Sequence, residues 1–134
     1  MPGFLDTNVA VRYLTGSPEE AATKATELIH GADSLYITHV ILAETAYVLS
    51  SFYRIPRSTV VDALVSLISR ENIQIWDGTI SGAVDALQLC RNSNRVSFAD
   101  ALLWSAARAS DAPVVYTFDQ SFPVYGITVA RPGA

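Results

Sequence analysis

Short apolar runs alternate with longer stretches of helical periodicity along the chain, and this pattern predicts an α/β fold. Five short runs have the composition of buried strands. They are Phe4-Leu5 and residues 35–37, 73–76, 114–116 and 127–129. The alternation of strands and helices is typical of a parallel sheet with right-handed crossovers.

The segments between these runs carry helical patterns, at about residues 9–14, 18–31, 39–52, 59–70, 80–89 and from 98 onwards. Thr38, Thr79 and Ser97 stand before three of them and are favoured N-cap residues. We therefore expect a three-layer fold in a single domain of residues 1–134. Its central parallel sheet of about five strands would have the order 3-2-1-4-5, with the first strand central, and helices would flank it.

Composition narrows the class of protein. An apolar share of 50% and a charged share of 16% are those of a folded domain, and a net charge of -4 argues against non-specific binding of polyanions. Cys90 is the single cysteine, which excludes a disulfide framework and a cysteine metal site. The start lacks a signal peptide, and the longest apolar stretch, residues 40–52, is too short to span a bilayer and contains Glu44. We expect a cytoplasmic protein that does not bind membranes.

Two aspartates follow predicted strands directly. Asp6 comes after Phe4-Leu5, and Asp119 ends Thr117-Phe118-Asp119 after the fourth strand. The carboxyl ends of parallel strands form the edge of the sheet at which ligands bind, and strands one and four are neighbours in the expected order. The alternative for Asp6 is that it only caps the following helix.

Two further carboxylates lie in apolar helices. Glu44 is the only charge between His39 and Phe52, so a buried Glu44 would have to pair, protonate or bind a cation. The alternative is a solvent-facing position. Asp100 fits a capping box with Ser97, and capping alone would also explain it.

All four carboxylates can reach one crevice in the expected fold. Their mutual repulsion would be severe without cations. Hard divalent ions with oxygen ligands, magnesium or manganese, are the natural solution. The sequence therefore predicts a divalent metal site.

The ordered set of motifs resembles the PIN-domain ribonucleases, specifically the VapC-type toxins of toxin–antitoxin pairs. The matching segments are Leu5-Asp6-Thr7-Asn8, Leu42-Ala43-Glu44, Ser97 to Leu102, and Thr117-Phe118-Asp119. The resemblance runs over nearly the whole chain, although Pro2-Gly3 shortens the first strand.

The resemblance implies that Asp6, Glu44, Asp100 and Asp119 hold one or two magnesium or manganese ions. Asn8 and Thr117 would orient the carboxylates or a metal-bound water. The implied activity is endonucleolytic hydrolysis of RNA.

The resemblance also implies partners. They are an RNA substrate, a second copy in a homodimer, and a cognate antitoxin that covers apolar grooves and blocks the acidic site. Arg12 and Arg95 are possible contacts to RNA phosphates.

Two other functions fit parts of the pattern. An aspartate after the first strand also serves as the nucleophile of phosphatases and phosphotransfer domains. Two features argue against such an enzyme. No second aspartate stands two residues after Asp6, and no lysine follows a late strand, because Lys24 is the only lysine. A non-catalytic PIN-like domain that binds RNA or protein is the alternative from another class; it is disfavoured because all four carboxylates are present.

Overall fold

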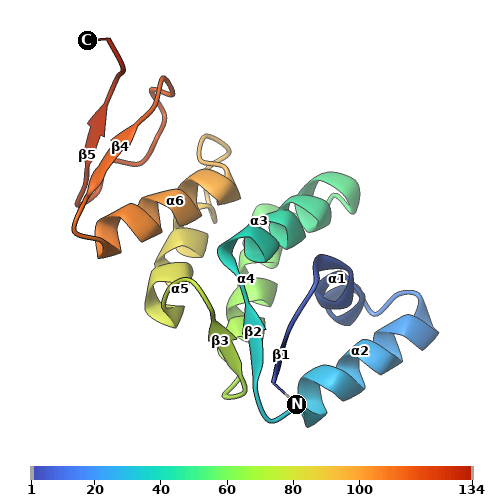
Figure 1. Ribbon diagram of the computed structural model, residues 1–134. Coiled ribbons are helices and arrows are strands. Elements are labelled where there is room, and N and C mark those ends of the chain that lie inside the picture. The colour runs from blue at the N-terminus through green and yellow to red at the C-terminus, as the bar shows by residue number, and fades with distance from the viewer. Residues whose placement is uncertain (1, 134) are drawn as a thin grey trace.

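The computed structural model describes residues 2–133 and confirms an α/β architecture with parallel sheets (Figure 1). The described residues form six α-helices, one π-helical turn (η1) and five short strands. In chain order these are β1 (Gly3–Phe4), α1 (Thr7–Thr15), α2 (Glu19–Gly31), β2 (Leu35–Ile37), α3 (His39–Tyr47), η1 (Val48–Phe52), α4 (Arg57–Ile68), β3 (Ile73–Ile75), α5 (Ile80–Leu89), α6 (Phe98–Ala109), β4 (Val114–Tyr116) and β5 (Thr128–Ala130).

Three of the predicted helix starts are confirmed by their hydrogen bonds. The side-chain oxygens of Thr38, Thr79 and Ser97 accept backbone N–H groups in the first turns of α3, α5 and α6. The helix expected over residues 39–52 changes its winding at Val48, where α3 passes into η1. None of the helices within residues 2–133 has the length and hydropathy of a membrane-spanning segment.

The strands form two separate parallel sheets, β1-β2-β3 and β4-β5. The prediction of one five-stranded sheet of order 3-2-1-4-5 needs correction, because β4 does not pair with β1 within the chain. The physical reason is that β4 has a small core of its own. Val115 packs there with Phe122 and with Trp104 of α6, so the β4–β5 pair lies beyond α6, with α5 and α6 between it and β1 (Figure 1).

The predicted three-layer arrangement also needs correction, because only one face of the β1-β2-β3 sheet is buried. Leu35, Ile37 and Ile73 of that face belong to the main hydrophobic core. Residues of the other face are open to solvent, with exposed fractions of 57% for Phe4 and 60% for Trp76. Strand side chains point alternately to the two faces, so helices cover one face of this sheet and not both.

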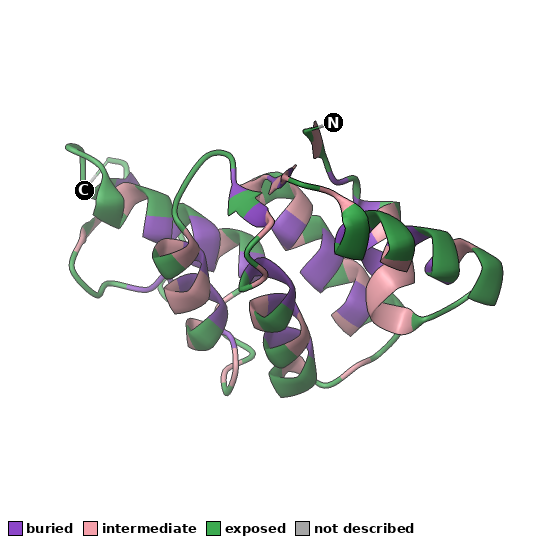
Figure 2. Ribbon diagram, turned by 90° about the horizontal axis from the view of Figure 1, so that it is seen from below, coloured by how far each residue is buried: buried purple, intermediate pink, exposed green. Residues whose placement is uncertain are grey.

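The main core lies between the sheet and the helices. Its fully buried members include Ile29 of α2, Leu42 of α3, Leu64 of α4 and Leu87 of α5. Figure 2 shows buried positions on the inner sides of the helices and exposed positions on their outer sides. This core fixes α1 and α3 beside each other, and the pocket described next lies between them.

Candidate functional site

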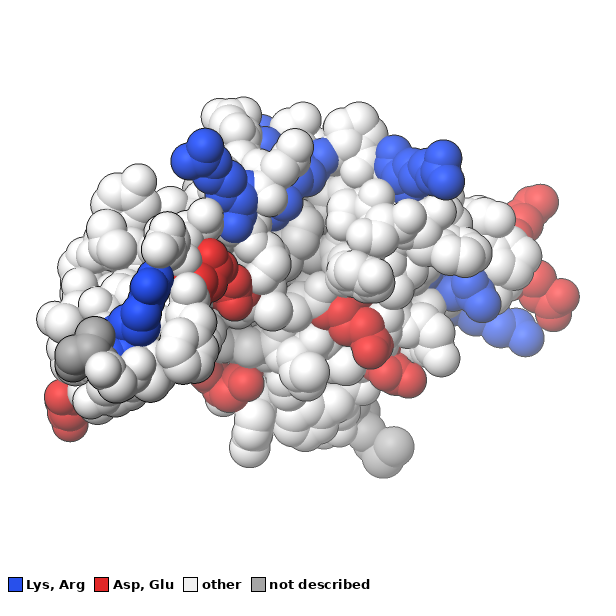
Figure 3. All heavy atoms as spheres, turned by 90° about the horizontal axis from the view of Figure 1, so that it is seen from above, with Lys and Arg blue, Asp and Glu red and all other residues white. Residues whose placement is uncertain are grey.

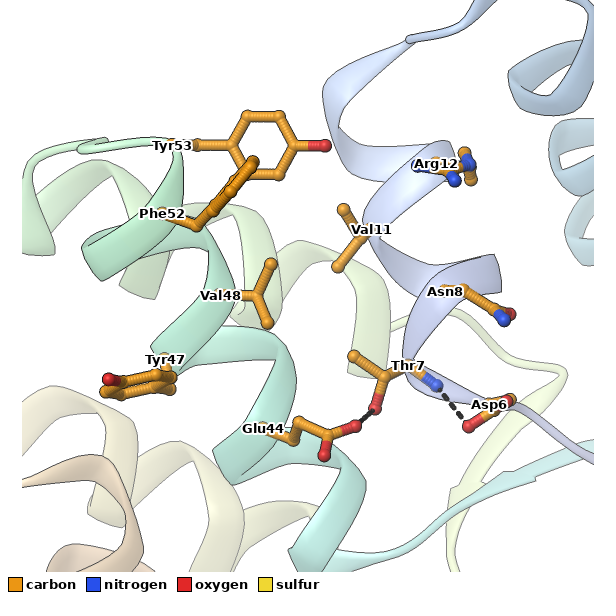
Figure 4. Close-up of a pocket in the computed structure, with 10 residues that line it drawn as sticks. All are labelled: Asp6, Thr7, Asn8, Val11, Arg12, Glu44, Tyr47, Val48, Phe52 and Tyr53. Atoms are coloured by element: carbon orange, nitrogen blue, oxygen red, sulfur yellow. Dashed lines mark hydrogen bonds between the residues drawn. The ribbon is translucent and has the colours of Figure 1, made fainter.

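A pocket of about 520 Å³ lies between α1 and the α3–η1 helix (Figure 4). Its size is that of ordinary small-ligand sites. One end is polar and the other is apolar. The lining residues are Asp6, Thr7, Asn8, Val11, Arg12, Glu44, Tyr47, Val48, Phe52 and Tyr53.

Asp6 caps α1 and also lines the pocket. Its Oδ1 atom accepts a hydrogen bond of 2.8 Å from the Thr7 backbone N–H. The capping interpretation is therefore confirmed, and it leaves the second carboxylate oxygen free to take a ligand because Asp6 is exposed. Capping and ligand binding are compatible, since the cap fixes the direction of the carboxylate.

Thr7 joins Asp6 to Glu44. The Thr7 hydroxyl donates a hydrogen bond to Glu44 Oε1, and the Thr7 side chain is buried (Figure 4). This bond links the first turn of α1 to the middle of α3. Sequence reasoning assigned no role to Thr7; the signal was a hydroxyl directly after Asp6, at a position that the cap places in the first helical turn.

Glu44 is exposed, which corrects the expectation of a buried carboxylate. The α3 residues around it are mixed in burial, with Leu42, Thr45 and Ala46 facing the core and Glu44 at the pocket. The alternative of a solvent-facing position for Glu44 is therefore confirmed. The Thr7 bond nevertheless sets Glu44 apart from an ordinary surface glutamate.

Asn8 and Arg12 line the pocket from α1. Figure 4 shows their side chains on the side of α1 that is turned away from α3. Neither side chain forms a hydrogen bond with Asp6 or Glu44. A supporting role for Asn8 and a phosphate contact for Arg12 stay predictions.

The other end of the pocket is apolar and aromatic. Val11 and Val48 form its floor between the two helices (Figure 4). Tyr47 and Phe52 stand at its rim with exposed fractions of 66% and 77%. Exposed aromatic side chains at a pocket mouth are suited to a base or to a partner protein.

Asp100 and Asp119 do not line this pocket. Asp100 lies in the first turn of α6, where its N–H donates to the Ser97 hydroxyl at 3.0 Å. Asp119 shapes the turn after β4: its N–H donates to Thr117 Oγ1 at 3.0 Å and its Oδ1 accepts Ser121 N–H at 2.8 Å. The predicted supporting residue Thr117 thus contacts Asp119. Arg95 lies in the loop before α6, outside this pocket.

The structure brings together two of the four predicted carboxylates. Across residues 2–133, no three side chains of Asp, Glu, His or Cys are grouped as a metal site would need. Figure 3 likewise shows the acidic side chains of one face in separate small groups. The four-carboxylate site stays a prediction.

The pair of Asp6 and Glu44 fits a hard divalent ion in kind. Magnesium keeps several waters and is usually held by one or two carboxylates together with substrate phosphates. Each of these two carboxylates accepts a hydrogen bond from Thr7 on one oxygen, and this bond would hold the carboxylate in place for a ligand.

Comparison with protein-family models gives a match over most of the chain. The PIN domain model matches residues 3–127, which is most of the chain and includes all the pocket residues. No curated protein matches the chain.

Proposed function

Because this chain belongs to the PIN-domain family, whose members are generally nucleases, we propose that it is a magnesium- or manganese-dependent endoribonuclease. The observation that carries the proposal is the pocket in which Asp6 and Glu44 lie on either side of Thr7. PIN nucleases typically use divalent metals, and these carboxylates suit such an ion.

Asp6 and Glu44 would hold the ion, with Asp100 and Asp119 as the further carboxylates of the proposed set. A bound divalent ion supplies positive charge at the scissile phosphate and makes a water more acidic. Thr7 keeps the Glu44 carboxylate in one orientation, and Asn8 and Thr117 would orient neighbouring groups. Arg12 would contact a phosphate of the RNA, as a planar guanidinium does well.

The aromatic rim supports a single-stranded RNA substrate. Unpaired bases are recognised largely by stacking on aromatic side chains. Tyr47, Phe52 and Tyr53 are exposed and line the same pocket as the two carboxylates, with Phe52 and Tyr53 at its other end (Figure 4). A strand whose phosphate lies at Asp6 and Glu44 could place a base on this rim.

The motif order also supports a role as the VapC-type toxin of a toxin–antitoxin pair. A cognate antitoxin would cover the apolar end of the pocket and so block access to the carboxylates. The same exposed side chains, Tyr47 and Phe52, are suited to bury against such a partner. A homodimer is part of this proposal.

Cleavage of a circular RNA tests the activity, because a molecule without ends is opened only by an endonuclease. We expect wild-type protein to convert the circle to linear product with magnesium or manganese. Glu44→Gln should be at least about 100-fold slower, since it removes the charge at the ion while keeping the shape. Glu27→Gln, an exposed glutamate of α2, should cleave like wild type. Equal cleavage by Glu44→Gln, or an intact circle with wild type, would contradict the proposal.

The toxin role has its own test. Expression of the chain without any partner should arrest bacterial growth, and Asp100→Ala should relieve the arrest at the same protein level. Normal growth in the presence of active nuclease would count against the toxin role alone.

A non-catalytic PIN-like domain that binds RNA or protein is the second candidate. One observation favours it: of the four predicted carboxylates, only Asp6 and Glu44 line the pocket, whereas Asp100 and Asp119 do not. RNA binding by wild type and by Glu44→Gln with equal affinity, and no cleavage by either, would support this alternative.

A further inference from the structure

Both sheets of the molecule have an open parallel edge. Among the described strands, β1 pairs only with β2, and β4 pairs only with β5. An open edge presents unpaired N–H and C=O groups on which another strand can pair. The two edges of one chain do not meet, because α5 and α6 lie between them (Figure 1).

The open edge of β1 presents the backbone of Phe4. Leu5 N–H donates to Tyr36 C=O at 2.8 Å, so Leu5 faces β2. Successive residues of a strand face opposite sides, and Phe4 N–H and C=O therefore face away from β2. The next residue on that open side is Asp6.

The open edge of β4 presents the backbones of Val114 and Tyr116. Thr117 N–H donates to Ala130 C=O at 3.0 Å, and Thr128 N–H donates to Pro113 C=O at 2.8 Å. Residues 113, 115 and 117 thus face β5, and the two residues between them face outward.

Joining these two edges in parallel has a defined register of side chains. In the parallel strand pairs of this structure, a residue whose backbone N–H and C=O point toward the partner strand stands opposite a residue whose backbone groups point away. Tyr36 and Phe4 are such a pair. The central register then sets Phe4 opposite Val115 and Leu5 opposite Tyr116. The Tyr116 side chain would then point to the same side as the buried face of the β1-β2-β3 sheet. The Val115 side chain, with α6 packed on it, would lie on the side of the solvent-exposed face.

The surfaces that would meet are apolar and exposed. On the first sheet the rings of Phe4, Tyr36 and Trp76 contact one another at centroid distances of 5.2–5.3 Å on the uncovered face. On the β4–β5 pair and the helix α6 that packs on it, Tyr116 is 72% exposed and Leu103 is 50% exposed. Joining the edges would cover both surfaces and complete the helix layer that the first sheet lacks.

A second copy is the occupant that the contacts favour. The β4–β5 pair is fixed to its own α6, because Trp104 is buried with Val115 and its Nε1 donates to Tyr125 C=O at 2.8 Å. Residues Phe98, Ala101 and Leu102 of the same helix belong to the main core. For β4 to pair with β1 of its own chain, these contacts of α6 would have to break.

The exposed area has the size that a dimer needs. The accessible surface is 7726 Å² for a chain of 14.5 kDa. A compact monomer of this mass would expose about 6,900 Å². The excess of roughly 800 Å² is the area that each partner buries in a standard interface.

We propose that two copies pair β4 of one with β1 of the other, so that the sheet order 3-2-1-4-5 forms across the dimer. The turn after β4 then carries the partner's Asp119 to the end of β1, beside Asp6. Each site would hold Asp6 and Glu44 of one chain and the partner's Asp119. This last part rests on the proposed nuclease function; the strand pairing does not.

Cysteine cross-linking tests the pairing without any activity. Chains with Phe4→Cys and chains with Val115→Cys, both in a Cys90→Ala background, are co-expressed and oxidised. We expect a disulfide between unlike chains, and none when Phe4→Cys is combined with Phe52→Cys. Failure to link the unlike chains, or an internal disulfide in a monomer that carries both cysteines, would overturn the pairing.

Mass measurement compares two matched variants. Wild type should sediment as a dimer, and Tyr116→Asp should become a monomer because it puts a charge on the core side of β1. Phe52→Asp changes an aromatic residue of similar exposure in the pocket rim and should stay a dimer. Loss of the dimer in Phe52→Asp and its persistence in Tyr116→Asp would contradict the proposal.

Mixing two inactive variants tests the shared site. If Asp6 and the partner's Asp119 form one site, mixed dimers of Asp6→Asn and Asp119→Asn contain one intact site, and co-refolding should restore up to about a quarter of wild-type cleavage. Active wild type with no restoration would exclude the shared site. Inactive wild type would count against the nuclease function, and cross-linking would still decide the pairing.

Discussion

The hydroxyl of Thr7 donates a hydrogen bond to the carboxylate of Glu44, and this bond joins two helices whose contact forms the pocket. Thr7 is buried while Glu44 is exposed. The threonine therefore acts from inside the molecule to hold a carboxylate that faces solvent. The next residue back, Asp6, is held by the backbone of the same Thr7.

Thr7→Val tests this arrangement, because valine keeps the shape of threonine and removes the donor. We expect cleavage to fall by roughly 10- to 100-fold, as one hydrogen bond to a charged group is worth about 1.5–3 kcal/mol. Thr7→Ser keeps the hydroxyl and should retain most of the activity. The kinetics are to be compared at saturating metal, with circular dichroism as the check on folding; unchanged rates in Thr7→Val would remove Thr7 from the site.

Arg57 fastens the segment between α5 and α6. Its Nε donates to Cys90 C=O at 3.0 Å, its second guanidinium nitrogen donates to Val96 C=O, and its charge lies 4.6 Å from the centroid of the Phe98 ring. We expect Arg57→Met to lower the free energy of unfolding by about 1–3 kcal/mol, because two partly buried carbonyls lose their donors.

Urea unfolding measures this effect. Arg131→Met, at an exposed position in the C-terminal segment, serves as the control and should leave the stability unchanged within about 0.5 kcal/mol. If the two arginine variants unfold at the same urea concentration, Arg57 does not fasten the loop.

Cys90 makes the stability depend on alkaline pH. Burial raises the pKa of the Cys90 thiol, and the nearby Arg57 guanidinium opposes the rise. A raised pKa in the folded state gives stability that is present below the ordinary thiol pKa, about 8.5, and is lost as the pH rises through the folded value. Between these two values the free energy of unfolding should fall with pH.

Chemical unfolding at a series of pH values checks this effect. Cys90→Ala lacks the thiol, so its stability should fall less steeply above about pH 8.5 than that of wild type. Equal slopes in the two proteins would show that the thiol does not titrate differently on folding.

Local patterns in the sequence predicted the elements well. The strand bounds at residues 35–37 and 114–116 and the caps Thr38, Thr79 and Ser97 follow from short-range chemistry that the sequence displays directly. The expectation of a PIN domain from the ordered motifs is confirmed over residues 3–127, and the VapC type stays a prediction.

The relations between distant elements were harder to predict. The separation of β4 from β1 depends on the cluster of Trp104, Val115 and Phe122, and a strand pattern alone does not reveal which helix such residues pack on. The Thr7–Glu44 contact joins residues 37 positions apart, so local periodicity carries no sign of it. The convergence of Asp100 and Asp119 on Asp6 rested on the expected strand order and stays a prediction.

RNA cleavage by wild type and Asp6→Asn, with magnesium, with manganese and with chelator, tests the central claim most directly. Asparagine retains a side-chain oxygen that can accept the cap bond, so folding should be preserved while the negative charge at the ion is lost. We predict cleavage by wild type with either metal, none with chelator, and a loss of at least about 100-fold in Asp6→Asn. Cleavage that persists in chelator, or that is equal in the two proteins, would contradict a metal-dependent nuclease at this pocket.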